Sequence, residues 1–110
     1  MYFVNITDIA EEEILTTVRY ISNELKAPIA ANNLLDEIEK HEDNLLESPN
    51  MYPNVPDEYL ASRGLKFVII KSYLMFFIIE EENKTVNVIR FMYGRRDWKN
   101  ILANYEEIGK

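Results

Sequence analysis

The stretch that decides the fold spans residues 63–105 and reads RGLKFVIIKSYLMFFIIEEENKTVNVIRFMYGRRDWKNILANY. β-branched and aromatic side chains dominate three segments of it, and short polar turns separate them. That composition predicts three consecutive strands followed by a short helix. The predicted strands are 63–70, 72–79 and 85–93, and the predicted helix is 97–105. Because Tyr73 to Ile79 is apolar at every position, we expect that strand to be central with both faces covered.

The residues before this stretch predict one strand and a first helix. Tyr2, Val4 and Ile6 would share one side of a short opening strand. Thr7 or Asp8 is suited to cap the next element, a helix. Its apolar stripe consists of Ala10, Ile14, Val18, Ile21 and Leu25. Steps of three and four residues predict that this stripe packs against the sheet.

A second helix begins near Pro28, a residue suited to the first helical turn. Its stripe consists of Ala31, Leu34, Ile38, His41 and Leu45. The connection between the helices is short, so they should pack antiparallel as a helical hairpin. Residues 47–62 contain Pro49, Pro53 and Pro56 and predict an ordered loop.

These elements predict one α+β domain over residues 1–110, in the order β-α-α-β-β-β-α. We expect an antiparallel sheet that the helical hairpin covers on one face. A functional site would then lie on the other face. The chain has no cysteine, which excludes disulfides, thiolate metal sites and cysteine nucleophiles. We expect a cytoplasmic protein, because neither a signal peptide nor an apolar run of membrane-spanning length is present.

The net charge of −7 is unevenly distributed. Residues 1–62 carry 13 acids against 3 lysines and arginines, whereas residues 63–110 carry 9 bases against 6 acids. The pattern predicts acidic helices and a mildly basic sheet. A solvated acidic surface without further function is the simpler interpretation of the first half.

Three short motifs occur in a particular order: IT-x-x-A at 6–10, the pair Tyr52-Pro53 followed by Arg63, and FMYGRRDW at 91–98. Together with the order of elements, they make the chain similar to the RelE/ParE family of bacterial toxins. The resemblance covers nearly the whole chain. It implies a growth-arresting, plasmid-stabilisation type toxin of a type II toxin–antitoxin pair, neutralised by an antitoxin protein.

One branch of this family cleaves messenger RNA on the ribosome. Such cleavage needs an activated ribose hydroxyl, a stabilised phosphorane and a proton donor for the leaving oxygen. By this resemblance the candidate catalytic residues are Arg63, Lys66 and Tyr93. The candidates for binding phosphate or antitoxin are Arg90, Arg95 and Arg96. Arginine suits this role because its planar fork holds two phosphate oxygens at once.

Each candidate also has a purely structural interpretation. Arg63 is as well suited to an ion pair with Asp57 or Glu58. Arg90 would place a charged head at the rim of the sheet, and Lys66 lies on a strand whose pattern does not fix its facing. For these three residues the sequence alone leaves both roles open.

Arg95 and Arg96 beside Asp97 would form a local ion-pair cluster, and Tyr93 would pack against Trp98. His41, the only histidine, falls in the apolar stripe of the second helix, so we interpret it as a packed residue and not as a catalytic one. Acid–base work would then fall on Tyr93 or a lysine.

Three functions are compatible with the resemblance. We favour ribosome-dependent, metal-independent cleavage of messenger RNA. The first alternative is a non-catalytic inhibitor of DNA gyrase, as in ParE-like members, and the second is a degenerate member that only binds antitoxin. We expect an acidic antitoxin segment to cover Arg63 and the Arg95-Arg96 pair. No metal or organic cofactor is expected, because the chain has no cysteine, one histidine and no phosphate-cradling glycine loop.

Overall fold

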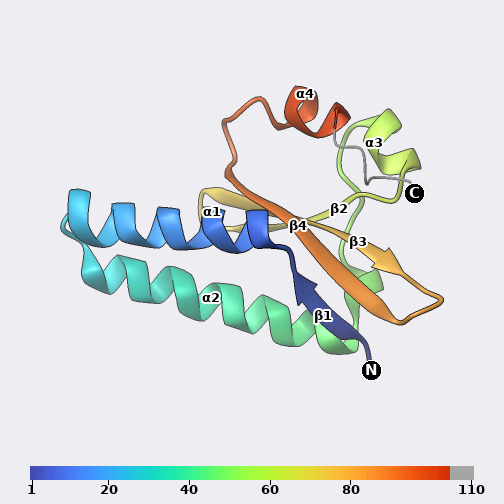
Figure 1. Cartoon of the computed structure of the whole chain (residues 1–110), viewed down its shortest axis with the longest axis horizontal. Helices are drawn as coiled ribbons and strands as arrows, with labels where there is room; N and C mark the ends of the chain where they lie inside the picture. Colours follow the sequence, from blue (N-terminus) through green and yellow to red (C-terminus); the bar gives the residue numbers. More distant parts are fainter. Residues whose placement is uncertain (105–110) are drawn as a thin grey trace.

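The computed structural model describes residues 1–104, in which four strands form one sheet (Figure 1). The strands are β1 (Phe3–Ile6), β2 (Lys66–Ile70), β3 (Tyr73–Glu80) and β4 (Thr85–Tyr93). Their order in the sheet is β1-β4-β3-β2, so the apolar β3 is central, as the sequence predicts. The α+β fold class is confirmed.

The expectation of a purely antiparallel sheet is wrong in one strand. β2, β3 and β4 form an antiparallel meander, but β1 pairs with β4 in parallel. Parallel neighbours need a long connection, and the helices with β2 and β3 supply it here. A four-residue strand carries no signal for its direction, because its alternation fixes only which side chains share a face.

Two long helices form the predicted hairpin (Figure 1). α1 (Asp8–Arg19) is capped at its N-terminus by Thr7, whose hydroxyl accepts a hydrogen bond from the Ala10 amide at 3.3 Å. α1 continues into a π-type turn, η1 (Tyr20–Glu24), in which the Leu25 amide donates to the Tyr20 carbonyl at 3.1 Å. α2 (Pro28–Glu47) begins at Pro28, as predicted.

The predicted apolar stripes hold except at one end. In α2, Ala31, Leu34, Ile38 and Leu45 are buried and His41 is half-buried. In α1 and η1 the prediction for Leu25 is wrong, since this side chain is 55% exposed. The wider π turn is the reason: it adds a residue to the turn and rotates the next residues away from the sheet.

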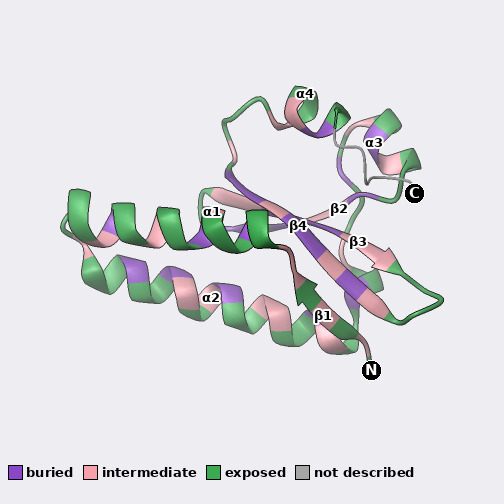
Figure 2. Ribbon diagram, viewed as in Figure 1, coloured by how far each residue is buried: buried purple, intermediate pink, exposed green. Residues whose placement is uncertain are grey.

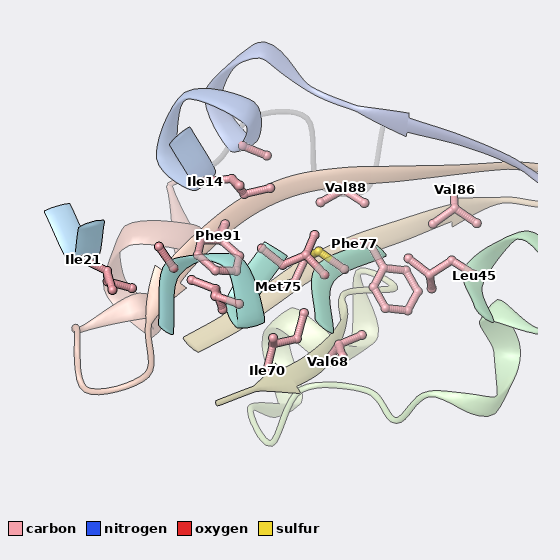
Figure 3. Packing of buried hydrophobic residues seen from close by; sticks show 14 residues of the cluster. Ile14, Ile21, Leu45, Val68, Ile70, Met75, Phe77, Val86, Val88 and Phe91 are labelled. Carbon is pink, nitrogen blue, oxygen red and sulfur yellow. The ribbon is translucent and has the colours of Figure 1, made fainter. Parts of the chain in front are cut away.

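The helical hairpin covers one face of the sheet, where side chains from α1 and α2 meet those of three strands (Figure 3). Ile14 and Leu45 of the helices pack in the same cluster as Met75, Phe77 and Phe91 of the strands. Figure 2 shows the result: the solvent side of α1 is exposed, whereas much of β4 is buried.

The opposite face of the sheet is also partly covered, as the apolar run from Tyr73 to Ile79 predicts. Two short helices, α3 (Glu58–Ser62) and α4 (Trp98–Ala103), lie on it. Their side chains form a second cluster with the strands, made of Val55, Leu60, Leu65, Phe76, Ile89, Met92 and Leu102. The apolar residues on the second side of β3 require this cover.

The loop predicted over 47–62 therefore contains the short helix η2 (Pro49–Met51) as well as α3. Asp57 caps α3, accepting a hydrogen bond from the Leu60 amide at 3.0 Å. α4 is anchored by Trp98, whose ring centre lies 5.3 Å from that of Phe76. Tyr105, which the sequence assigns to the inner face of this helix, lies outside the described residues.

A β-bulge interrupts β4. Phe77 pairs with Val88 but Phe76 pairs with Arg90, so one extra residue stands in β4 at this point. Before the bulge, Val86 and Val88 face the helical hairpin, whereas after it Phe91 does. The extra residue therefore changes which side chains face the helices in the second half of the strand.

Candidate functional site

The predicted catalytic residues lie at three separate places. Arg63 follows α3 on the second face, where its guanidinium lies 5.5 Å from the centre of the Tyr59 ring. Lys66 alternates with the buried Val68 and so faces the helical hairpin, and its Nζ donates to the Tyr52 carbonyl at 2.9 Å. Tyr93 lies at the end of β4, 44% exposed.

The strand pairing gives the scale of their separation. Lys66 pairs with Phe77 of β3, and Tyr93 pairs with Tyr73 of the same strand. These partners are four residue steps apart along β3, which corresponds to about 13 Å. Lys66 and Tyr93 also lie on opposite sides of β3, about 10 Å apart across the sheet. The backbones of Lys66 and Tyr93 are therefore well separated, and the Lys66 ammonium is bound to the Tyr52 carbonyl.

Arg90 forms an ion pair with Glu13 of α1. Its Nε donates to Glu13 Oε1 at 3.0 Å and its terminal nitrogen to Oε2 at 2.8 Å, a bidentate arrangement. The same Oε1 accepts the Phe91 amide at 2.9 Å. The two side chains are only 17% and 18% exposed. This contact fastens α1 to the part of β4 that lies beyond the last residue of β1.

Arg95 and Arg96 lie in the loop between β4 and α4, and both are exposed. Within residues 1–104, neither forms an ion pair with Asp97. Asp97 instead accepts a hydrogen bond from the side-chain amide of Asn100 at 2.6 Å. The expected packing of Tyr93 against Trp98 is not observed. The Tyr93 ring instead lies edge to face with the Tyr73 ring, with 5.9 Å between the ring centres.

His41 and Lys66 approach the same tyrosine. His41 Nδ1 shares a hydrogen bond of 2.8 Å with the Tyr52 hydroxyl, and Lys66 donates to the carbonyl of that residue. The Tyr52 ring also packs edge to face on Phe77. This is the packed role that the sequence predicts for His41, with Tyr52 as the partner that spacing alone does not reveal.

An apolar groove of about 1060 Å³ lies between α1 and the end of β4. Its lining residues include Ile9, Tyr20, Tyr73, Phe91, Tyr93 and Arg96. Burial, with the neighbouring phenols of Tyr93 and Tyr20, raises the pKa of Tyr73, so its hydroxyl remains neutral at physiological pH. The groove therefore offers an aromatic surface, and its charged side chains come from α1 and from the loop after β4.

A second, polar cavity of about 700 Å³ lies on the other face, beside Arg63. Asn5, Asn87 and Glu80 form a row of hydrogen bonds along it, each 3.0 Å long. The acids Glu80, Glu81 and Glu82 also line this cavity. Arg63 and Arg96 thus belong to different cavities on different faces. Among residues 1–104, no cluster of histidines or acids has the arrangement of a metal site.

Comparison with known proteins decides the family. Residues 4–98 match the model of the ParE toxin of the type II toxin–antitoxin system parDE. The chain belongs to the ParE toxin family. It is therefore a toxin of a type II toxin–antitoxin system. No curated protein sequence matches it.

A solved structure shows the fold of this ParE-family toxin. A chain in the chromosomal ParDE system from P. aeruginosa superposes with a TM-score of 0.67 at 16% identity. The match covers 84% of this toxin and 96% of that chain. The toxin–antitoxin complex RelBE2 from Mycobacterium tuberculosis gives a TM-score of 0.46 at 15% identity, over the same shares of each chain.

The apolar groove is the feature of the toxin that the sequence did not reveal. Tyr20, Tyr73 and Tyr93 come from three elements, and no spacing rule brings them together. One signal was present: Ile9 lies off the predicted stripe of α1, yet it is apolar. A single exposed apolar side chain is common, but Ile9 together with the exposed Tyr20 and Leu25 forms an apolar patch of the kind that marks a binding surface. None of the helices described is long and apolar enough to cross a membrane.

Proposed function

We propose that this toxin acts by binding a protein target without cutting RNA, and that the target is DNA gyrase. The observation that carries the proposal is the separation of Arg63, Lys66 and Tyr93. Acid–base catalysis of phosphodiester cleavage requires its groups within hydrogen-bond reach of one phosphate. Here Lys66 faces the helical hairpin at one end of the sheet, while Tyr93 stands at the other end of β3.

Electrostatics support the same proposal. Each cavity that contains a candidate arginine is also lined by carboxylates: Glu80 to Glu82 beside Arg63, and Asp8 and Glu12 beside Arg96. Arg90 is already held by Glu13. RNA binding depends on surfaces that neutralise phosphate, and paired or acid-flanked arginines do this poorly. A surface that binds protein needs no matched acid and base.

The apolar groove is the proposed binding site for the antitoxin. Antitoxin segments of this family fold on the toxin as a strand or an amphipathic helix, a mode that suits an apolar groove. Ile9, Tyr20 and Leu25 are each more than half exposed in the isolated toxin. Burying them gives the antitoxin segment the hydrophobic stabilisation that offsets the entropy lost when it becomes ordered.

Induced expression in a bacterial host tests the target. We expect gyrase–DNA cleavage complexes to accumulate while pulse-labelled protein synthesis is initially normal. A fall in protein synthesis within minutes, with cut messages and intact DNA, would contradict the proposal and favour messenger RNA cleavage. A chain that the host tolerates fully would be a degenerate member.

Two substitutions sharpen this test. Tyr93→Phe removes a hydroxyl but keeps the ring, and Arg63→Ala removes the candidate phosphate-binding charge. If the toxin cleaves RNA, loss of the proton donor in Tyr93→Phe should lower the cleavage rate about a hundredfold or more. If it acts by binding, Tyr93→Phe should keep its toxicity within about threefold, because the aromatic contact is retained. Tyr20→Phe, in the same groove, is the matched control for Tyr93→Phe.

A further inference from the structure

We infer that the groove selects an antitoxin segment by charge: a cationic side chain of the segment lies against α1, and an anionic one lies against the loop after β4. This inference rests on the proposed antitoxin site and adds the chemistry of its occupant. It replaces the expectation of an acidic segment that covers Arg63 together with the Arg95-Arg96 pair, because Arg63 and Arg96 lie in different cavities.

The α1 wall of the groove is negative. Asp8, Glu12 and Glu13 all line it, and Glu12 lies one helical turn after Asp8 on the same side of the helix. Glu13 is neutralised by its bidentate pair with Arg90. Asp8 and Glu12 are exposed, and within residues 1–104 no base forms an ion pair with either. Two uncompensated carboxylates therefore remain on this wall.

The loop wall is positive. Arg96 lines the groove, is exposed and has no ion-pair partner within the described residues. Its backbone is fixed by the hydrogen bond from its amide to the Tyr93 carbonyl at 3.0 Å. Arg95, the adjacent residue, does not line the groove. The charge is thus placed at the groove by the turn after β4.

Opposite charges on two walls of one apolar groove define an orientation. A segment with apolar side chains between a base and an acid fits in one direction, whereas the reverse direction places like charges together. Like-charge contacts at an interface are costly and exclude wrong partners. The two walls thus distinguish among amphipathic segments that would bury the same apolar area.

Charge reversal with adjacent controls tests the inference. The probe is the antitoxin encoded beside the toxin gene, purified and titrated calorimetrically against each toxin variant. We expect Glu12→Lys and Arg96→Glu each to weaken binding about tenfold. Their controls, Glu11→Lys and Arg95→Glu, change the net charge equally, but those residues do not line the groove. The controls should bind within about twofold of the unchanged toxin.

A third variant separates this inference from the proposed site. Ile9 is 51% exposed, so Ile9→Asp leaves the core intact but places a charge in the groove. Weak binding by Ile9→Asp together with weak binding by both reversals supports the inference. If Ile9→Asp binds weakly but either charge reversal binds the antitoxin as tightly as its control variant, the charge selection is overturned and the proposed site is kept. Normal binding by Ile9→Asp overturns the site itself.

Discussion

Glu13 satisfies three donors with one carboxylate, two on Arg90 and one on the Phe91 amide. β1 has already ended here, since its last residue, Ile6, pairs with Val88. The carboxylate therefore takes the place of the strand carbonyl that would otherwise accept the Phe91 amide. An unprotected strand edge invites pairing with another chain, and this side chain closes it.

We expect Glu13→Ala to lower the free energy of unfolding by about 2 to 3 kcal/mol, because it removes the carboxylate that accepts hydrogen bonds from a largely buried guanidinium and from a backbone amide. Urea denaturation of the purified toxin measures the change. Glu12→Ala is the matched control: its exposed side chain accepts no hydrogen bond within residues 1–104, so its effect should stay within about 0.5 kcal/mol. Equal losses in the two variants would contradict the assigned role.

The sequence indicates that Arg90 and His41 have distinctive positions, but it does not predict which side chains they contact. Arg90 stands out as a charged residue in an apolar strand, but its partner is 77 positions away. His41 could be assigned to packing from its place in the stripe, whereas the Tyr52 hydroxyl that bonds it belongs to a loop. Such pairings depend on the crossing of helices and strands, which local periodicity does not encode.

At the level of elements, α2 carries a carboxylate whose ionisation is disfavoured by its surroundings. Burial, followed by the charges of Glu39 and Asp43, raises the pKa of Glu42. A carboxyl with a raised pKa in the folded state favours folding while it is protonated, and this contribution is lost as the pH rises through that pKa. Ionised Glu42 is therefore destabilising at neutral pH.

The substitution Glu42→Gln should accordingly raise the melting temperature at pH 7. The gain should disappear below about pH 4, where the carboxyl is protonated in both folded and unfolded chains. Thermal unfolding followed by circular dichroism at the two pH values measures this difference. A gain of the same size at both pH values would mean that the amide improves packing and that ionisation is not the cause.

Strands and long helices could be predicted from the sequence because their signals are local. β4 spans Thr85–Tyr93, as predicted, and α2 begins at its proline. The π turn at Tyr20–Glu24 and the five-residue α3 could not be predicted in this way. Short or irregular turns are stabilised by tertiary contacts more than by propensity, so the pattern within them is weak.

For the whole molecule, the two faces of the sheet differ in the length of the helices that cover them. α1 and α2 are long and share a continuous cluster with the sheet, whereas α3 and α4 have five and six residues. Helices that short do not persist without their tertiary contacts. The layer formed by α3 and α4 should therefore open locally, without unfolding of the sheet and the helical hairpin.

Hydrogen exchange of the native toxin tests this difference. Amides of α4 should exchange at least about tenfold faster than those of β3, because local opening needs less free energy than global unfolding. Trp98→Ala should accelerate exchange in α4 further, since the contact of this ring with Phe76 is lost. Equal protection of α4 and β3 would contradict the separate opening, because it would mean that α4 and the sheet unfold as one unit.

The bulge in β4 gives this strand two phases of side-chain alternation in one continuous segment. Even-numbered valines face the helical hairpin before it and odd-numbered aromatics after it. Removing one residue between Val88 and Arg90 would give the strand a single alternation and keep its pairing with β3, so Phe91 would still face the helical hairpin. A deletion elsewhere in β4 would exchange the two faces of part of the strand, so the length of this strand is more constrained outside the bulge than at it.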